Sequence, residues 1–349
     1  MKKEKIILAI LSLAMIAGSM LGLSVLIEHI QGQEVVERIE TAEGKTGKAA
    51  EGDAEQAGIT EKPFQVLVSG LDLTSSMKKK RVGRSDLNLL LTVNPVSKKI
   101  LITNISRDTY LEVVDPPEMS EEEEKNLKAN GLTKDQIKGI KEARKNNPKT
   151  KLCHVSLYGT STLVKTVEGF LDTKIDYYVQ TTMAGFRTLI DAIGGVDVEA
   201  VESFQTDWDT SFKKGSNHVN GKKAATFIRE RHHFNEGELR RGKNGIEMMR
   251  AIIDKLCHVS LLEMDADKLY QLWKDNVKTD MGAGEVLSLL RMQVEDRAEW
   301  EFTSAQIKGE EGREKLMEYQ QHEFYVWVPD PASIEKVQKK IADVCQIDS

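Results

Sequence analysis

Arginine and aspartate residues stand at the ends of three apolar runs in this 349-residue sequence. The charged residues that flank these runs are Asp72, Arg84, Asp86, Arg107 and Asp108. Arginine guanidinium groups bind phosphoryl oxygens through paired hydrogen bonds, and aspartates hold Mg²⁺, which bridges carboxylate to phosphate. Phosphoryl transfer depends mainly on positioning and charge neutralisation. The residue types therefore suit the handling of a phosphate ester or anhydride.

The three apolar runs are predicted to be the strands that position these charges: FQVLVSG (64–70), LNLLLTV (87–93) and KILITNI (99–105). Asn94-Pro95 marks a tight turn, so the second and third strands are expected to form an antiparallel hairpin. If the first strand runs parallel to the third, all five charged residues meet at one edge of the sheet. Nearly continuous apolar runs indicate strands that are covered on both faces, as in a three-layer α/β domain.

More arginines occur in the segment RERHHFNEGELRR (229–241). Arg229 and Arg231 would point about 200° apart on a continuous helix, so both face one ligand only if the helix predicted from residue 220 ends near Arg229. The amphipathic helix predicted for residues 246–256 follows. Taken alone, each of these charged residues has about even odds of belonging to a structural ion pair rather than to a ligand site. The functional prediction therefore rests on the whole set.

The N-terminal region predicts a membrane anchor. Residues 6–27 contain no charged residue, and a helix of that length can cross a hydrocarbon core of roughly 30 Å. Lysines precede this stretch and an acidic segment follows it, so residues 1–5 are expected to stay cytoplasmic and the remainder to be extracytoplasmic. Residues 28–62, rich in Glu, Gly, Ala and Lys, are predicted to be a flexible linker, and residues 63–349 the folded domain.

Residues 115–150 are strongly charged and contain few apolar residues. They are predicted to be an insertion of one or two exposed helices separated at Gly131, most simply a solvated excursion. Outside this insertion, helices and strands are expected to alternate at 160–171, 175–181, 183–193 and 196–200.

The bulk composition excludes several classes of function. The formal net charge of −6 gives no global positive field that would attract nucleic acid. The three cysteines show no CxxC spacing and are predicted to be buried thiols. The sequence contains neither a GxxxxGK[ST] motif nor a protein-kinase signature, so the standard nucleotide-binding folds are excluded.

Several motifs, in their order along the chain, resemble the LytR-CpsA-Psr family. They are GLD, GRSD, ISRDTY, DYYV, AIGGVDV and RERHHFNEGELRR, which together span about residues 64 to 256. The resemblance implies an extracytoplasmic phosphotransferase with an α/β fold and an apolar tunnel over the sheet. Such an enzyme moves a glycopolymer, of the teichoic acid or capsular polysaccharide type, from undecaprenyl pyrophosphate to peptidoglycan as a sugar phosphate.

The same resemblance implies roles for individual residues. Asp72 and Asp86 correspond to the aspartates associated with Mg²⁺. The positions that surround the pyrophosphate are Arg84, Arg107, Arg229, Arg231 and Arg241. Arg107, Asp86 and Asp108 are the candidate catalytic residues, and either aspartate would accept the proton of the acceptor hydroxyl. Glu238 stands where the family usually has Asp and is a candidate accessory residue.

Two positions depart from the family pattern: Gly245 replaces a Gln and Cys153 replaces an Asn. Loss of one polar phosphate contact would weaken binding by about 1–3 kcal/mol without removing the chemistry. A non-catalytic scaffold that binds polyprenyl phosphate therefore stays an alternative. A transcriptional attenuator is the third hypothesis, against which the predicted membrane span, the acidic charge and the missing DNA-reading helix all count.

Overall fold

The computed structural model describes most of the domain that follows the linker. The described residues are 58–72, 83–206, 210–231, 234, 237–258, 272, 274–282, 285, 288, 289, 292 and 300–346. The predicted anchor at 6–27 and the predicted linker up to residue 57 lie outside them. Within the described part of the chain, no helix has the length and apolar character needed to cross a membrane.

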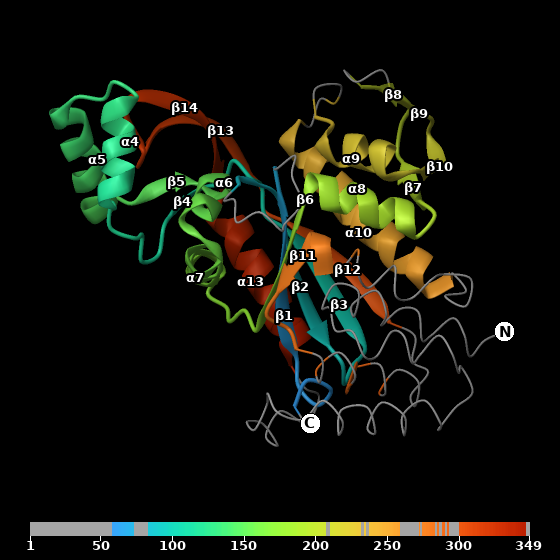
Figure 1. The fold of residues 1–349 in the computed structure, drawn as a ribbon. Helices are drawn as coiled ribbons and strands as arrows, with labels where there is room; N and C mark the ends of the chain where they lie inside the picture. The colour runs from blue at the N-terminus through green and yellow to red at the C-terminus, as the bar shows by residue number, and fades with distance from the viewer. Residues whose placement is uncertain are drawn as a thin grey trace, which may run out of the picture.

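A mixed sheet of six strands forms the centre of the described fold, in the order β11–β6–β1–β2–β3–β12 (Figure 1). Its strands are β1 (Phe64–Leu71), β2 (Ser85–Asn94), β3 (Lys99–Asn104), β6 (Tyr177–Thr182), β11 (Val277–Thr279) and β12 (Glu301–Gln306). β2 is antiparallel to both β1 and β3, which confirms the predicted hairpin. β1 and β3 consequently run in the same direction. This was the condition for the five charged residues at the strand ends to meet at one edge of the sheet.

Helices cover both faces of this sheet (Figure 1). On one face, α7 (Thr160–Leu171) and α13 (Pro331–Cys345) share a core with Leu67, Leu90 and Leu101 of the central strands. On the other face, α10 (Glu238–His258) approaches Leu87 and Asn104. Because successive side chains of a strand alternate between faces, the two sets of contacts confirm the predicted mixed α/β fold with helices on both sides.

A smaller substructure packs beside α10 and carries the predicted arginine segment. Its core joins α8 (Met183–Ala192) and α9 (Gly221–Arg229) to the strand pair β7 (Val196–Ala200) and β10 (Gly215–Val219). The short ribbon of β8 (Phe204–Gln205) and β9 (Ser211–Phe212) lies at its edge.

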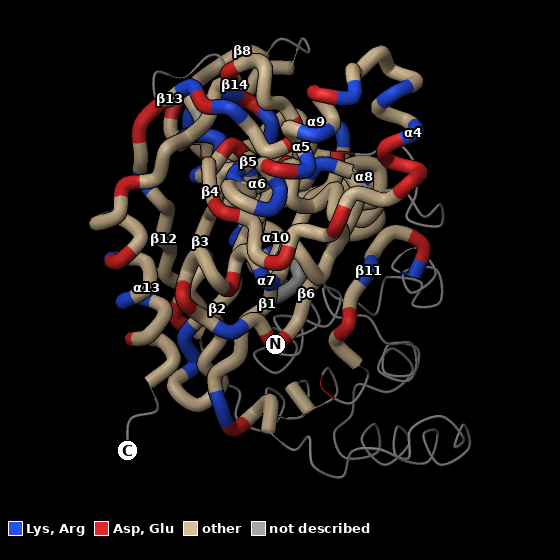
Figure 2. Tube along the Cα trace, turned by 90° about the vertical axis from the view of Figure 1, so that its left-hand side faces the viewer, with Lys and Arg blue, Asp and Glu red and all other residues tan. Residues whose placement is uncertain are grey.

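The insertion forms two helices, as the sequence predicts: α4 (Glu121–Ala129) and α5 (Lys134–Asn146). Gly131 lies between them with φ of +87°, a left-handed conformation that glycine adopts without strain. α4 has no buried residue, whereas α5 buries Ile137 and Ile140 and packs against β14 (Tyr319–Pro329). Acidic and basic positions lie side by side along both helices (Figure 2).

Two strand pairs connect the insertion to the central sheet. β4 (Tyr110–Glu112) pairs with β5 (Lys149–Lys151), so the insertion leaves and re-enters the domain through one short ladder. β13 (Gly309–Leu316) pairs with β14, and Trp327 of β14 bridges to Thr109. The short helices α6 (Leu152–Val155) and η1 (Ser156–Tyr158) follow β5.

Candidate functional site

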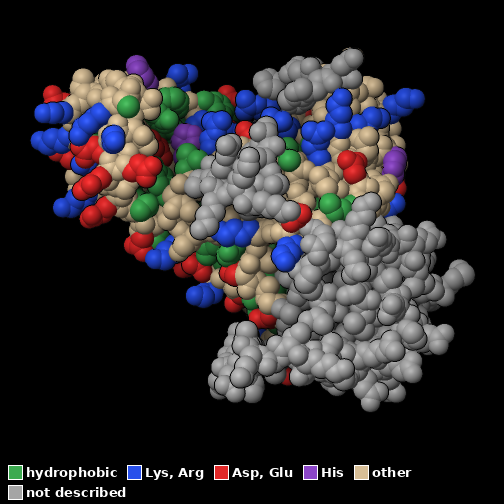
Figure 3. Space-filling view, viewed as in Figure 1, with side chains coloured by type: hydrophobic (Ala, Val, Ile, Leu, Met, Phe, Trp, Pro, Cys, Tyr) green, Lys and Arg blue, Asp and Glu red, His purple; other side chains and the backbone are tan. Residues whose placement is uncertain are grey.

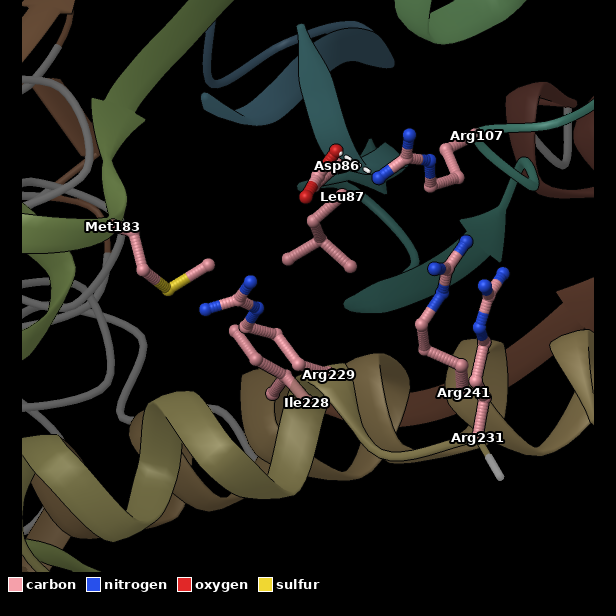
Figure 4. A pocket seen from close by; sticks show the side chains of 8 residues that line it. All are labelled: Asp86, Leu87, Arg107, Met183, Ile228, Arg229, Arg231 and Arg241. Carbon is pink, nitrogen blue, oxygen red and sulfur yellow. Dashed lines mark hydrogen bonds and ion pairs between the residues drawn. The ribbon is translucent and has the colours of Figure 1, made fainter. Parts of the chain in front are cut away.

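A pocket of about 200 Å³ lies where β2 begins and β3 has just ended. Four arginines and one aspartate line it together with three apolar side chains: Arg107, Arg229, Arg231, Arg241, Asp86, Leu87, Met183 and Ile228 (Figure 4). In the space-filling view, basic side chains gather across the upper part of the molecule (Figure 3). Residues far apart in the sequence thus converge on one concave site.

Asp86 and Arg107 meet because the hairpin is antiparallel. Asp86 is the second residue of β2 and Arg107 lies three residues beyond the end of β3, so the two ends are neighbours in space. The Arg107 guanidinium donates a hydrogen bond to the Asp86 carboxylate. Burial raises the pKa of Asp86 and outweighs the opposing effect of Arg107, while the negative charge of Asp72 raises this pKa further.

Arg229 and Arg231 reach the same pocket because α9 ends between them. Asn220 caps the start of α9 by accepting a hydrogen bond from the Lys223 N–H, and Arg229 is the last helical residue. Glu230 already has extended dihedral angles, φ of −67° and ψ of 129°. The predicted helix end is therefore confirmed. In Figure 4, Arg231 lies beside Arg241, and both side chains extend towards Arg107.

Arg241 is placed by the close approach of α10 to the sheet. A Cβ atom at Gly242 would collide with the side chains of Asn104 and Gln306, so only glycine permits this packing. Gln306 also donates a hydrogen bond of 2.8 Å from Nε2 to the backbone oxygen of Leu239. These contacts place the first turn of α10, and with it Arg241, against the ends of β3 and β12.

Asp108 lies behind the pocket as a counter-ion shared by several cations. Its side chain is only 4% exposed, and Lys151 Nζ lies 3.0 Å from its Oδ1. Three arginines lie slightly further from its carboxylate oxygens, at 3.8–3.9 Å: Arg107, Arg231 and Arg241. Burial alone would raise the pKa of Asp108, but Lys151, Arg107 and Arg241 together hold it below its usual value.

Sequence reasoning missed Lys151. It pairs across the β4–β5 ladder with Tyr110, two residues after Asp108, and the whole insertion separates the two strands in the sequence. A lysine that is more than 40 residues from its partner carries no local signal. Only the pairing of β4 with β5 shows that Lys151 belongs to this charged cluster.

The remaining predicted residues occupy different places. Asp72 lies near Asp86, since its charge raises the pKa of Asp86, and its backbone N–H donates a hydrogen bond of 2.8 Å to the Arg84 oxygen. Arg84 is exposed and is not among the described residues that line the pocket. Glu238 begins α10, but its side chain lies outside the described part of the structure.

The positions that depart from the family pattern border this site. Cys153 is fully buried, and its backbone N–H donates a hydrogen bond of 2.9 Å to the Arg107 oxygen. Burial raises the pKa of this thiol to about 11, so it stays protonated. Gly245 lies one turn beyond Arg241, and a Cβ atom there would be 2.7 Å from Cδ1 of Leu87 in the pocket wall. The predicted burial of Cys153 is confirmed, and Cys345 is half-buried.

The acidic residues of the site suit a hard cation only in combination with other ligands. In the described part of the chain, no cluster of three or more His, Cys, Asp or Glu side chains could hold a metal ion. Mg²⁺ is commonly held by one or two carboxylates, with phosphate oxygens and water completing its shell. Asp86 lines the pocket, and Asp72 lies near enough for its charge to raise the pKa of Asp86, so two carboxylates of the kind that would suit Mg²⁺ bound together with a phosphorylated ligand stand near the pocket.

Comparison with known proteins gives this arrangement a family. A model of the LytR_cpsA_psr family matches residues 27–343. The chain belongs to this family. It is 30% identical over 246 residues to the polyisoprenyl-teichoic acid–peptidoglycan teichoic acid transferase TagU of Bacillus cereus, covering 70% of this chain and 69% of that protein. It is 27% identical over 296 residues to TagV of Bacillus subtilis, which has the same enzyme name, covering 83% and 66% respectively.

Solved structures support the same family. The crystal structure of B. subtilis TagV is 26% identical, with a TM-score of 0.59 over 82% of this chain and 99% of that one. A structure of TagT bound to LIIa-WTA is 21% identical, with a TM-score of 0.58 over 86% and 98% of the two chains. This second likeness concerns the fold alone. Together they establish the LytR-CpsA-Psr fold for the domain.

Proposed function

We propose that this LytR-CpsA-Psr protein transfers a glycopolymer of the teichoic acid class from a polyprenyl diphosphate carrier to peptidoglycan. One observation carries the proposal: four arginines and a single aspartate line one pocket. That lining has three positive charges more than negative ones, which suits the diphosphate that links lipid to polymer. The enzyme names of the relatives TagU and TagV point to the same substrates.

The arginines hold the diphosphate before and during the reaction. Their planar guanidinium groups bind phosphoryl oxygens in pairs and remain charged at every physiological pH. Asp108 and Lys151 lie behind them, and the buried carboxylate limits the mutual repulsion of the cations while the ligand is absent. Charge that develops on the phosphoryl oxygens in the transition state is then met by donors already in place.

The transfer step needs a proton acceptor beside the diphosphate, and Asp86 fits this role better than Asp108. Asp86 lines the pocket and has a raised pKa, whereas Asp108 is buried among cations with a lowered pKa. The oxygen of an acceptor sugar hydroxyl forms a bond to the phosphorus that carries the polymer. The bond from that phosphorus to the bridging oxygen breaks, polyprenyl phosphate leaves, and the hydroxyl proton passes to Asp86.

Asp72 and Asp86 would hold Mg²⁺, whose charge would neutralise oxygens of the bound diphosphate.

We further propose that residues 6–27 anchor the protein in the cell membrane with the domain outside, as their sequence indicates. Capsular polysaccharide remains the other polymer type expected from the resemblance. The topology is tested by fusing to the C-terminus a reporter enzyme that works only in the cytoplasm. Reporter activity in this fusion would contradict the topology and favour the attenuator hypothesis.

A reconstituted assay tests the proposal. Purified protein in lipid vesicles is supplied with polyprenyl diphosphate-linked teichoic acid, Mg²⁺ and peptidoglycan, and both polymer attachment and released polyprenyl phosphate are measured. We expect equal amounts of both products, with almost none from Asp86→Asn. Protein that binds the lipid but releases no polyprenyl phosphate would instead be a scaffold, which is the alternative that Gly245 leaves open.

A further inference from the structure

The segment that carries Arg107 and Asp108 is held from two sides by backbone hydrogen bonds. On one side, the Cys153 N–H of α6 donates to the Arg107 oxygen at 2.9 Å. On the other side, the Trp327 N–H of β14 donates to the backbone oxygen of Asp108 at 2.8 Å. These bonds fix the backbone, but they do not select among the side-chain rotamers of Asp108. The direction of its carboxylate therefore depends on neighbouring side chains.

Among the described residues, Lys151 is the cation nearest to Asp108, and it approaches one particular oxygen. Lys151 Nζ donates a hydrogen bond of 3.0 Å to Oδ1, and the two side chains are only 14% and 4% exposed. Arg107 Nε lies 3.8 Å from the same oxygen. Arg231 and Arg241 are each 3.9 Å from the other oxygen, Oδ2. A charged hydrogen bond at 3.0 Å is directional, whereas contacts of 3.8–3.9 Å lie beyond hydrogen-bond distance. Lys151 thus holds Oδ1, and Oδ2 faces two arginines of the pocket.

The position of Lys151 is set by its strand and by an aromatic ring. Lys151 is the last residue of β5 and pairs with Tyr110 of β4. Its ammonium group lies 5.6 Å from the centroid of the Tyr325 ring in β14, a distance at which the ring face attracts a cation. Lys151 is not among the described residues that line the pocket. Its ammonium group therefore reaches Asp108 from the strand pair that supports the insertion.

We propose that Lys151 is a positioning residue for the diphosphate site, an inference that rests on the proposed function. The negative charge of Asp108 offsets part of the positive charge that the arginines present to a diphosphate. Lys151 neutralises some of that negative charge and keeps Oδ1 turned towards itself, so more of the positive charge of the arginines acts on the ligand. Burial would raise the pKa of Asp108, and among the charges that overcome this effect Lys151 has the largest. Lys151 thus acts through Asp108 and does not touch the ligand.

The test compares Lys151→Met with Lys149→Met. Lys149 is the first residue of the same strand, so both variants remove one positive charge from β5. The dissociation constant for inorganic pyrophosphate with Mg²⁺ is measured by titration calorimetry on the full chain. We expect Lys151→Met to weaken binding about tenfold, the effect typical of losing one hydrogen bond to a charged group, and Lys149→Met to leave the constant unchanged. Lys151→Arg keeps the charge and a donor, so it should restore most of the affinity. Equal affinities of the two methionine variants would overturn the inference.

A double-mutant cycle with Asp108→Asn separates an effect through Asp108 from direct attraction between Lys151 and the ligand. If Lys151 acts through the carboxylate, Lys151→Met should hardly change pyrophosphate binding once Asp108→Asn has removed that charge. Direct attraction would persist in the Asp108→Asn background, and the same loss of affinity there would overturn the positioning role. If Lys151→Met does not fold, Lys151→Gln takes its place in the cycle, because it removes the charge but keeps a hydrogen-bond donor.

The inference and the proposed function fail in different ways. Protein that binds pyrophosphate but transfers no polymer refutes the transferase activity, while a cycle in which Lys151→Met acts only when Asp108 is present still supports the positioning role. If wild-type protein binds no pyrophosphate, crystal structures decide. In Lys151→Met, the carboxylate of Asp108 should turn away from the orientation in which Lys151 now holds Oδ1 at 3.0 Å. An unchanged orientation would overturn the inference.

Discussion

The pocket and the insertion use the same charged residue types in different proportions. In the insertion, Arg144 is 5% exposed, and its two terminal nitrogens bind both carboxylate oxygens of Glu123 at 2.7 and 3.1 Å. Lys128 and Lys141 both reach Glu124. In the pocket, four arginines share the lining with one aspartate. Matched charges hold a structure together, whereas an excess of one sign in a concave site indicates a ligand of the other sign.

This difference predicts opposite responses to substitution. A buried cation that loses its matched partner destabilises the fold, because the charge has been removed from water without compensation. In the pocket, several cations share the buried Asp108 carboxylate, so the loss of one of them leaves this carboxylate with other partners and should cost little stability although it removes function. The comparison can therefore be tested by measuring stability and transfer on the same variants.

Replacing Arg107 with alanine should have the largest effect. We expect polymer transfer to fall by at least about a hundredfold, the loss typical of removing one preorganised donor to a developing negative charge. Arg144→Ala is the matched control from the insertion and should keep the wild-type rate per folded molecule. The reconstituted transfer assay measures both variants. Normal transfer by Arg107→Ala would remove the pocket from the mechanism.

Acidification should stop transfer by protonating Asp86. Burial raises the pKa of Asp86 in the ligand-free site, and bound Mg²⁺ would lower it again; the ionised form, which accepts the proton, is lost as the pH falls through the resulting pKa. Transfer should then fall about tenfold per pH unit below that value. Asp108, with its lowered pKa, stays ionised in this range. A pH–rate profile measures this loss, and a transfer rate that stays constant as the pH falls would contradict the assignment.

Removing Glu123 should affect stability but not transfer. Glu123→Ala leaves the guanidinium of buried Arg144 without its bidentate partner, which should cost about 1–2 kcal/mol because Glu123 itself is partly exposed. Thermal unfolding measures the loss. Arg231→Ala is the contrasting variant and should change the melting temperature little while weakening pyrophosphate binding, because Asp108 keeps Lys151 as its nearest partner. The reverse pattern would show that the charge balance of the two regions does not separate their roles.

The smallest effect is expected at Gly245. A glutamine there must displace the Leu87 side chain, whose Cδ1 would lie 2.7 Å from the new Cβ. In return, its amide adds a donor beside the pocket, and a hydrogen bond to a charged phosphate outweighs the displacement of one flexible side chain. We expect Gly245→Gln to bind pyrophosphate about threefold more tightly. Calorimetry measures the change, with Gly245→Ala as the control that displaces Leu87 without adding the amide.

Much of the site could be predicted from local patterns. The Asn94-Pro95 turn between two apolar runs was enough to place Asp86 beside Arg107, because an antiparallel hairpin brings the start of one strand next to the end of the other. The two-residue spacing of Arg229 and Arg231 likewise predicted where α9 ends. Both features involve residues that are close in the sequence, and over such short distances the backbone can adopt only a few conformations.

Long-range features could not be predicted. β12 pairs with β3 although the two strands are almost 200 residues apart in the sequence. Nothing in the sequence of β12 identifies β3 as its partner. Lys151 reaches Asp108 only because β5 pairs with β4 across the insertion. Phe234 stands in a strongly charged segment of the sequence, and only the fold shows that its ring lies edge-on against Phe204 of β8, 30 residues earlier.

The sequence by itself determined the types of the charged residues and the strand ends on which they stand, since turn residues and apolar runs act over a few positions. Tertiary structure decided which of those charges share a pocket. Arg84 and Arg107 read alike in the sequence, yet Arg84 is exposed and Arg107 lines the site. The reason is physical: the balance of burial and neighbouring charge at each residue depends on segments that folding brings together from distant parts of the chain.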